Sequence, residues 1–356
     1  MIITTTLTKM IFAVILSLAP QFHSFIYPIT LNGSGRRRSF LATTLSATTK
    51  NLSSLPRGIS PFESKSDTLP QEFRSIATRA WNDASKAGGG DCWEIEFPPL
   101  LFQGKSQFDD FDNISELNLN RDWCVEWLPT LSSTSSATWL VLPDAKECEI
   151  AKNEWQGQRY RDAAKFTTIE DVTKFYDGDG GYTKPWGATL SDGMKNLLQS
   201  DADPASDDLT TEAAPSLHLV CQPGNGGPVE DWINVEQIHN ARSTDCSTII
   251  VNGALDKVRD GYYPAIFFPA LAQTTKRFYA LPEKVQSLFY LRPLSDKGAY
   301  GWLYRVYPEP WQVILQTVVE KNDKKIVQEE LVYSSEERPS FTTALRKLQQ
   351  AALSPQ

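Results

Sequence analysis

A glycine-rich turn, Pro223-Gly-Asn-Gly-Gly-Pro228, is the first place where residue types and spacing suggest chemistry. It follows an apolar run and precedes a helical pattern, and backbone N–H groups at the start of a helix can hold a phosphate. The glycines that would supply this site are Gly224, Gly226 and Gly227. However, the spacing matches neither Gly-x-Gly-x-x-Gly nor Gly-x-x-x-x-Gly-Lys-Ser/Thr, and Glu230 and Asp231 would repel a phosphate. A plain strand-to-helix turn is therefore the favoured interpretation, with phosphate binding as the alternative.

The aromatic segment 301–313 is the second candidate site. Read as a strand, it places Leu303, Arg305 and Tyr307 on one face, with Pro308 and Pro310 forming the next turn. Arg305 is then either a contact for an anion or partner, or a buried cation paired with Glu309 whose loss would cost ~3–5 kcal/mol. We expect the buried pair. The possible structural or contact residues are Arg305, Tyr307, Glu309 and Trp311.

Other combinations of reactive residues are incomplete in the sequence. The loop 177–181 lacks the calcium ligands of an EF-hand, and the acidic residues of 109–112 accompany no phosphate-binding motif. Cys221, His239 and Asp245 would form a nucleophile, base and orienter only if the fold brought them together, which we do not expect. No two Cys or His residues have the spacing of zinc ligands. We predict no catalytic residue, no metal site and no cofactor.

Strands and helices alternate along the chain that must position these residues. Apolar runs predict buried strands near 92–97, 138–142, 217–221 and 247–251, separated by helical patterns, which favours a mostly parallel sheet. In the first of these, Glu94 and Glu96 alternate with apolar residues, which indicates a half-exposed strand. The predicted core includes Trp93, Ile95, Trp139, Val141, Leu219, Ile249, Val251, Leu303 and Val313.

The C-terminal part has a different pattern. Consecutive strand-like runs from 285 to 333 predict antiparallel strands at one edge, and a helix over 339–352 closes the chain. The predicted fold class is α/β, three-layered, with a mixed sheet whose parallel strands come first and whose antiparallel strands form the C-terminal edge.

Charge and hydropathy divide the chain into a leader and a folded part. The 356 residues carry a net charge of -8, which argues against a general nucleic-acid binder. Residues 1–62 nevertheless hold six basic and no acidic side chains. An apolar run at 10–19, too short for a spanning helix, is followed by a Ser/Thr-rich stretch with an arginine triplet.

This leader predicts a two-part address. We interpret residues 1–24 as a signal peptide, 25–66 as a plastid transit peptide and disordered leader, and 67–354 as a single α/β domain with an insertion-like loop region at 157–215. The predicted location is the stroma of a plastid (chloroplast), with no transmembrane segment in the mature chain. Plain secretion is the alternative, with glycosylation sequons at Asn32, Asn51 and Asn113, but five widely spaced cysteines argue against it.

Several segments, taken in order, carry a resemblance to a known family. They are Leu69-Pro70 before an amphipathic helix, Trp93-Glu-Ile-Glu-Phe-Pro98, Ile249-Ile-Val-Asn252 followed by Arg277-Phe278, Phe289-Tyr-Leu-x-Pro293, Arg305-Val-Tyr-Pro-Glu-Pro-Trp-Gln-Val313, and Arg338-Pro-Ser340. Together they resemble the domain of unknown function 1995 family of cyanobacteria and plastids, over roughly 69–352. The region 157–215 departs from the compact family pattern.

The resemblance implies a soluble plastid auxiliary protein more than an enzyme. Plant members include factors for photosystem II assembly, and one member is fused to a plastid adenylate kinase. Because the family has no agreed catalytic residues, none are transferred to this chain. Two functions stay open: a non-enzymatic assembly or scaffold factor, whose partner is a photosynthetic membrane protein or its assembly factors, and a nucleotide- or phosphometabolite-binding protein, in which case the chain could be an enzyme. Neither involves nucleic acid.

Overall fold

A computed structural model describes most of the chain from residue 54 onward, within the compact unit Asn51–Gln356. The described ranges are 54–60, 67–88, 92–103, 113–131, 137–178, 180–185, 213–224, 228–321 and 324–353. The predicted signal and transit peptides lie almost entirely outside these ranges, as do Gly226, Gly227 and most of the acidic loop 200–214.

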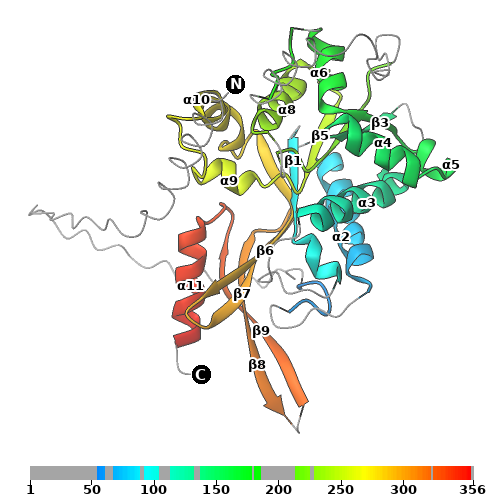
Figure 1. The fold of residues 1–356 in the computed structure, drawn as a ribbon. Helices are drawn as coiled ribbons and strands as arrows, with labels where there is room; N and C mark the ends of the chain where they lie inside the picture. The colour runs from blue at the N-terminus through cyan, green and yellow to red at the C-terminus, as the bar shows by residue number, and fades with distance from the viewer. Residues whose placement is uncertain are drawn as a thin grey trace, which may run out of the picture. The chain divides into compact units, whose positions relative to one another are not determined.

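One mixed sheet of nine strands organises the described residues, in the order β3-β2-β4-β5-β1-β6-β7-β8-β9 (Figure 1). In this order, neighbouring strands pair in parallel from β3 across the sheet to β6. From β6 to β9 they pair antiparallel. The strands are β1 (Cys92–Glu96), β2 (Thr138–Leu142), β3 (Lys165–Thr168), β4 (Leu217–Cys221), β5 (Ser247–Val251), β6 (Val285–Asp296), β7 (Ala299–Val306), β8 (Trp311–Lys321) and β9 (Lys324–Ser335). The predicted α/β class and its mixed sheet are confirmed.

Helices cover both faces of this sheet, which gives three layers. One face carries α2 (Leu69–Ala87), the 3-10 helix η1 (Pro99–Gln103), α3 (Asn113–Leu131), α4 (Ala145–Glu154) and α5 (Gln158–Arg161). The other carries α6 (Ile169–Asp177), α8 (Glu230–Ala241), α9 (Leu255–Arg259), α10 (Pro269–Thr274), the π-helical turn η4 (Thr275–Tyr279) and α11 (Phe341–Leu353). Alternation along the strands serves both layers: Ile249 and Val251 of β5 face the first group of helices, and Ile250 faces the second.

The two faces have different cores. On the face of α2 and α3, one continuous apolar cluster reaches from β3 to β8, and we call it the first core. On the opposite face there are two clusters: a second core around Trp139 and Trp232, and a third core under α11 that includes Leu303 and Leu348. Every residue of the predicted core is buried.

Three details of the fold differ from the sequence-based expectations. Glu94, expected on a half-exposed strand, is completely buried because β1 lies in the middle of the sheet between β5 and β6. Tyr307 does not share the face of Arg305: β7 ends at Val306, and the Tyr307 ring packs edge-on against Trp93, 5.0 Å away between ring centroids.

The third difference is β3, which the sequence did not predict. It occupies part of the region 157–215 that was expected to be an insertion-like loop, and it forms the outer parallel strand. The helix α6 follows it directly, with Thr168 as its N-cap residue. Thr168 Oγ1 accepts the N–H of Asp171 at 3.0 Å and donates to the Asp171 carboxylate at 2.8 Å.

Candidate functional site

A cleft of about 640 Å³ lies between the second and third cores, over β6 and β7. Its walls come from α9, the end of η4, the strands β6 to β8 and the segment 336–341 that leads into α11. Four guanidinium groups line it, and we call it the arginine cleft: Arg259, Arg292, Arg305 and Arg338. Its volume is within the usual range for small-molecule sites.

The buried carboxylate of Glu94 forms the floor next to this cleft. Arg259 Nη1 donates to both of its oxygens, at 2.8 and 2.9 Å, and Ser287 Oγ donates to Oε2 at 2.9 Å. Arg338 Nη1 adds a longer contact of 3.4 Å. A fully buried carboxylate is costly unless it is paired, so these donors are a condition for β1 to fold with a glutamate at this position.

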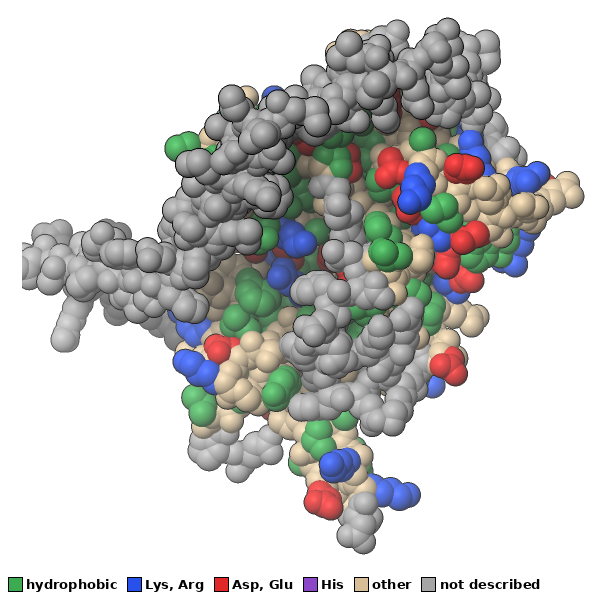
Figure 2. Space-filling model, viewed as in Figure 1, with side chains coloured by type: hydrophobic (Ala, Val, Ile, Leu, Met, Phe, Trp, Pro, Cys, Tyr) green, Lys and Arg blue, Asp and Glu red, His purple; other side chains and the backbone are tan. Residues whose placement is uncertain are grey.

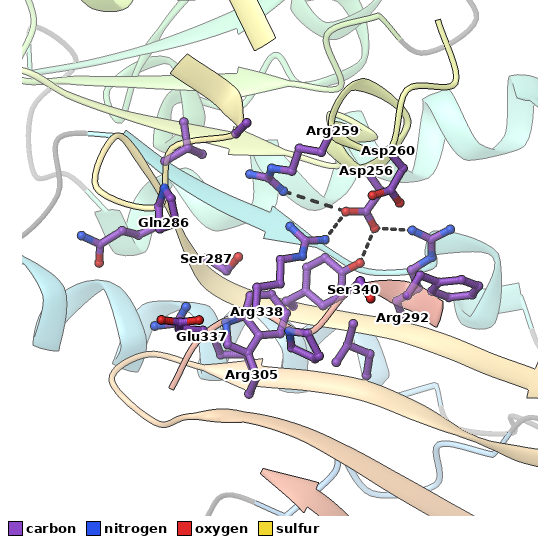
Figure 3. Close-up of a pocket in the computed structure, with 18 of the residues that line it drawn as sticks. Asp256, Arg259, Asp260, Gln286, Ser287, Arg292, Arg305, Glu337, Arg338 and Ser340 are labelled. Carbon is purple, nitrogen blue, oxygen red and sulfur yellow. Dashed lines mark hydrogen bonds and ion pairs between the residues drawn. The ribbon is translucent and has the colours of Figure 1, made fainter. Parts of the chain in front are cut away.

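A second carboxylate, Asp256 at the start of α9, forms ion pairs with three of the four arginines. Figure 3 shows Arg259, Arg292 and Arg338 converging on it. The Tyr290 hydroxyl also donates to Asp256. Although burial raises the pKa of Asp256, Arg338 and Arg292 outweigh it and hold that pKa below its ordinary value.

Local sequence explains how distant segments supply these side chains. Asp256 and Arg259 are one turn apart on α9 and therefore lie on the same side of it. Arg338 precedes Pro339, which favours an extended backbone and ends the strand-like path before α11 begins. Burial lowers the pKa of Arg338, but Glu94, Tyr290 and Asp256 outweigh burial, so its pKa is raised.

Arg305 lies at the other side of the cleft, against Trp311. Its guanidinium carbon is 5.3 Å from the centre of the Trp311 ring, and that of Arg338 is 5.0 Å from the same ring. Its Nε donates to the backbone carbonyl of Glu309 at 3.3 Å, and this hydrogen bond is to the main chain and not to the carboxylate that the sequence suggested. Burial lowers the pKa of Arg305, which is half-buried.

The cleft is therefore equipped for binding more than for acid–base catalysis. The oxygens of Glu94 and Asp256 already accept hydrogen bonds from arginines and hydroxyls, and neither is placed as an open general base. Among the described residues, no histidine or cysteine lines the cleft. Guanidinium groups with N–H donors that face the cleft can instead hold a carboxylate or phosphate.

In many sheets of this type, ligands bind at the carboxyl ends of the parallel strands. Here, buried side-chain amides occupy that place. Asn120 of α3 donates to Gln222 after β4 at 2.7 Å, and Asn252 after β5 donates to Asn120 at 2.5 Å. The Asn252 oxygen accepts the N–H of Phe97 at 2.8 Å. These buried amides satisfy one another and close this edge.

In the described part of the predicted phosphate turn, the backbone N–H of Gly224 already has a hydrogen-bond acceptor within the protein. Gly224 has a positive φ of 72°, and its N–H donates to Asp231 Oδ2 at 3.0 Å. Burial raises the pKa of Asp231 to about 7. The carboxylate of this chain therefore takes the donor that a phosphate would need, while Gly226 and Gly227 lie outside the described residues.

The cysteine and histidine residues that the structure describes do not form the reactive site considered in the sequence. Cys221 belongs to the first core, and His239 lies on the opposite face of the sheet, so the structure separates the pair considered in the sequence. A different pair meets instead: Cys246 Sγ lies 3.4 Å from His218 Nδ1. Burial raises the pKa of Cys246 to about 11 and lowers that of His218 to about 3, so both are neutral and unreactive at physiological pH.

No helix in the described ranges of the chain combines the length and apolar character that crossing a bilayer requires. No group of three or more His, Cys, Asp or Glu side chains in these ranges is arranged to hold a metal ion.

In a comparison with protein families, residues 70–344 match the family described as Domain of unknown function (DUF1995). The chain belongs to the DUF1995 family. No curated protein and no solved structure matches it. In this DUF1995 chain, four of the segments that carried the resemblance lie at the arginine cleft. They supply Glu94, Tyr290, Arg305 and Arg338.

The cleft could be predicted from the sequence only in part. Arg305 and Trp311 were singled out, but Arg259, Arg292 and Asp256 were not. Glu94 gave no distinct local signal, because in β1 it alternates with apolar residues as a charge on a half-exposed strand does.

Proposed function

We propose that this DUF1995 protein is a plastid auxiliary protein that acts by binding, and that the arginine cleft recognises an anionic group of its ligand or partner. The observation that carries the proposal is the arrangement of four guanidinium groups around a cleft whose two interior carboxylates are already paired. Binding sites for carboxylates and phosphates commonly use such arginine donors.

The rest of the lining restricts which anions fit. Three acidic side chains also line the cleft and repel a small, fully hydrated anion: Asp260, Glu336 and Glu337. Trp311 and Phe341 provide apolar surface beside the arginines. The site therefore suits an anionic group attached to an apolar or aromatic body, which gains contacts that inorganic phosphate cannot make.

A role in assembly of the photosynthetic apparatus is the form of this proposal that the leader and the family resemblance favour. The second candidate, a nucleotide- or phosphometabolite-binding protein, is compatible with the same cleft. It is less compatible with the turn at 223–228, because Asp231 already accepts the Gly224 N–H.

Calorimetric titration of the purified chain tests the site. The probes are inorganic phosphate, ATP and a short acidic peptide with an aromatic residue, each measured against the native chain and the Arg305→Gln variant. Arg346→Gln is the matched control, because Arg346 is exposed on α11 and does not line the cleft. We expect at least one aromatic anion to bind the native chain and the control alike, and Arg305→Gln to weaken it about tenfold or more. Equal affinity of all three chains would reject the cleft as the site.

A fusion tests the proposed location. Residues 1–66 joined to a fluorescent protein should enter the plastid of an alga with a complex plastid. Retention in the secretory pathway or release into the medium would contradict the plastid assignment.

A further inference from the structure

The outer strand β9 is an open and unusually exposed sheet edge. All residues from Lys324 to Leu331 are exposed, and β9 pairs only with β8 in the described sheet. The strand β7 pairs with β8 no further than Gln316, so the end of the β8–β9 hairpin extends past it (Figure 1). A long edge with unpaired backbone groups is a template for another strand.

The exposed part of the β8–β9 hairpin carries large apolar residues, and the charges along β9 are separated by sign. Val318, Ile326, Val327 and Leu331 are each between 38% and 45% exposed, although they are large hydrophobic residues. Figure 2 shows basic, acidic and hydrophobic side chains together at the end of this hairpin. The charge sequence along β9 is Lys324-Lys325, then Glu329-Glu330, which is basic at one end and acidic at the other.

We propose that β9 pairs with β9 of a second copy of this chain, antiparallel and about a two-fold axis at Val327. In an antiparallel pair, two facing residues either both point their N–H and C=O groups toward the partner strand or both point them away. Because this direction alternates along a strand, a two-fold axis must pass through a residue and not between two residues. With the axis at Val327, Lys324 faces Glu330 of the other copy and Lys325 faces Glu329. With the axis at Ile326 or Gln328, neither lysine faces a glutamate.

The hairpin's own cross-strand pairs support this register. Val318 lies opposite Val327, so the two-fold pairing forms a continuous valine row across both copies. Lys321 lies opposite Lys324, an unfavourable like-charge pair that Glu330 of the second copy would relieve. An isologous contact of this kind closes on itself and gives a dimer, not a fibre.

Charge reversal with a complementary mixture tests the proposal. Sedimentation velocity of the purified full chain should show a concentration-dependent dimer. The variants Lys324→Glu/Lys325→Glu and Glu329→Lys/Glu330→Lys should each dimerise about tenfold more weakly or not at all, because like charges then face each other. Their equimolar mixture should form a heterodimer, because every facing pair is then opposite in sign.

A net-charge control and a crosslink complete the test. Lys276→Glu/Lys284→Glu changes the net charge by the same amount as Lys324→Glu/Lys325→Glu, but at exposed positions away from β9. It should leave the dimer intact. Val327→Cys should form an intermolecular disulfide, whereas Ile326→Cys should not, because residues two places out of register are about 7–8 Å apart. The native cysteines of the described chain are buried and should not interfere. A native chain that is monomeric at all concentrations, or a mixture that fails to associate, would overturn the proposal.

Discussion

Replacing Arg259 by methionine removes the closest partner of a carboxylate that has no contact with water. Glu94 is 0% exposed, and Arg259 makes both of its shortest arginine contacts, at 2.8 and 2.9 Å. Removing one member of a buried ion pair typically costs ~3–5 kcal/mol. Ser287 and the longer contact from Arg338 remain, so we expect Arg259→Met to cost about 3 kcal/mol.

A double-mutant cycle separates this charge effect from lost packing. Glu94→Gln alone leaves Arg259 without its closest charged partner, and the double variant removes both charges of the pair. We therefore expect the double variant to be less destabilised than the sum of the singles by about 2 kcal/mol or more. Urea unfolding at pH 7 gives each free energy, with slopes that should stay unchanged if the denatured state is unaffected.

The matched control is an exposed pair on α6. Lys174 lies 2.8 Å from Glu170, and both side chains are more than a third exposed, so the same cycle there should give a coupling of only ~0.3–0.5 kcal/mol. A coupling at Glu94 and Arg259 as small as that of the control would refute the account of the cleft floor given above.

Three further perturbations test other parts of the structure. Burial, with Glu94 and Asp256 nearby, raises the pKa of Glu96 from 4.5 to about 8, so the folded chain holds a proton that the unfolded chain releases and stability falls as pH rises through that window. Glu96→Gln should therefore be about 1–3 kcal/mol more stable than the native chain at pH 8.5 and equal to it near pH 4 in denaturant melts, and a pH-independent difference would contradict this. Gly224→Ala should cost about 2–4 kcal/mol, because its Cβ would lie 2.4 Å from the Trp232 ring, whereas Gly88→Ala, also at positive φ but with open space around it, should cost about 1 kcal/mol in the same melts. Arg305→Ala should cost about 1 kcal/mol, because its contacts are a backbone carbonyl and an indole ring, and a loss above 3 kcal/mol would indicate a buried ion pair after all.

The sequence predicted the sheet well because burial leaves a local pattern. The parallel strands β2, β4 and β5 are short apolar runs bounded by turns, and each appeared near its observed limits. β3 was missed because its four residues, Lys-Phe-Thr-Thr, have no such pattern and are held by pairing to β2. Its existence depends on a neighbour that lies more than twenty residues away in the sequence.

The candidate site was largely hidden for a similar reason. Glu94 and Arg338 are 244 residues apart, and no local spacing connects them. A charge in a central strand has the same alternation as one on a half-exposed strand, so Glu94 was assigned to the surface. Only the position of β1 between β5 and β6 shows that this charge needs a partner inside the protein.

The division of one face into two cores also bears on how the sheet can deform. The first core is continuous across the sheet, while on the opposite face the apolar packing is interrupted by ion pairs around Glu94 and Asp256. Bending about β1 and β6 would stretch those ion pairs, which water can solvate, and would leave the first core closed. The face that carries the arginine cleft can therefore open while the first core stays packed. Hydrogen exchange at α9 and at the start of α11 should then be faster than in α3.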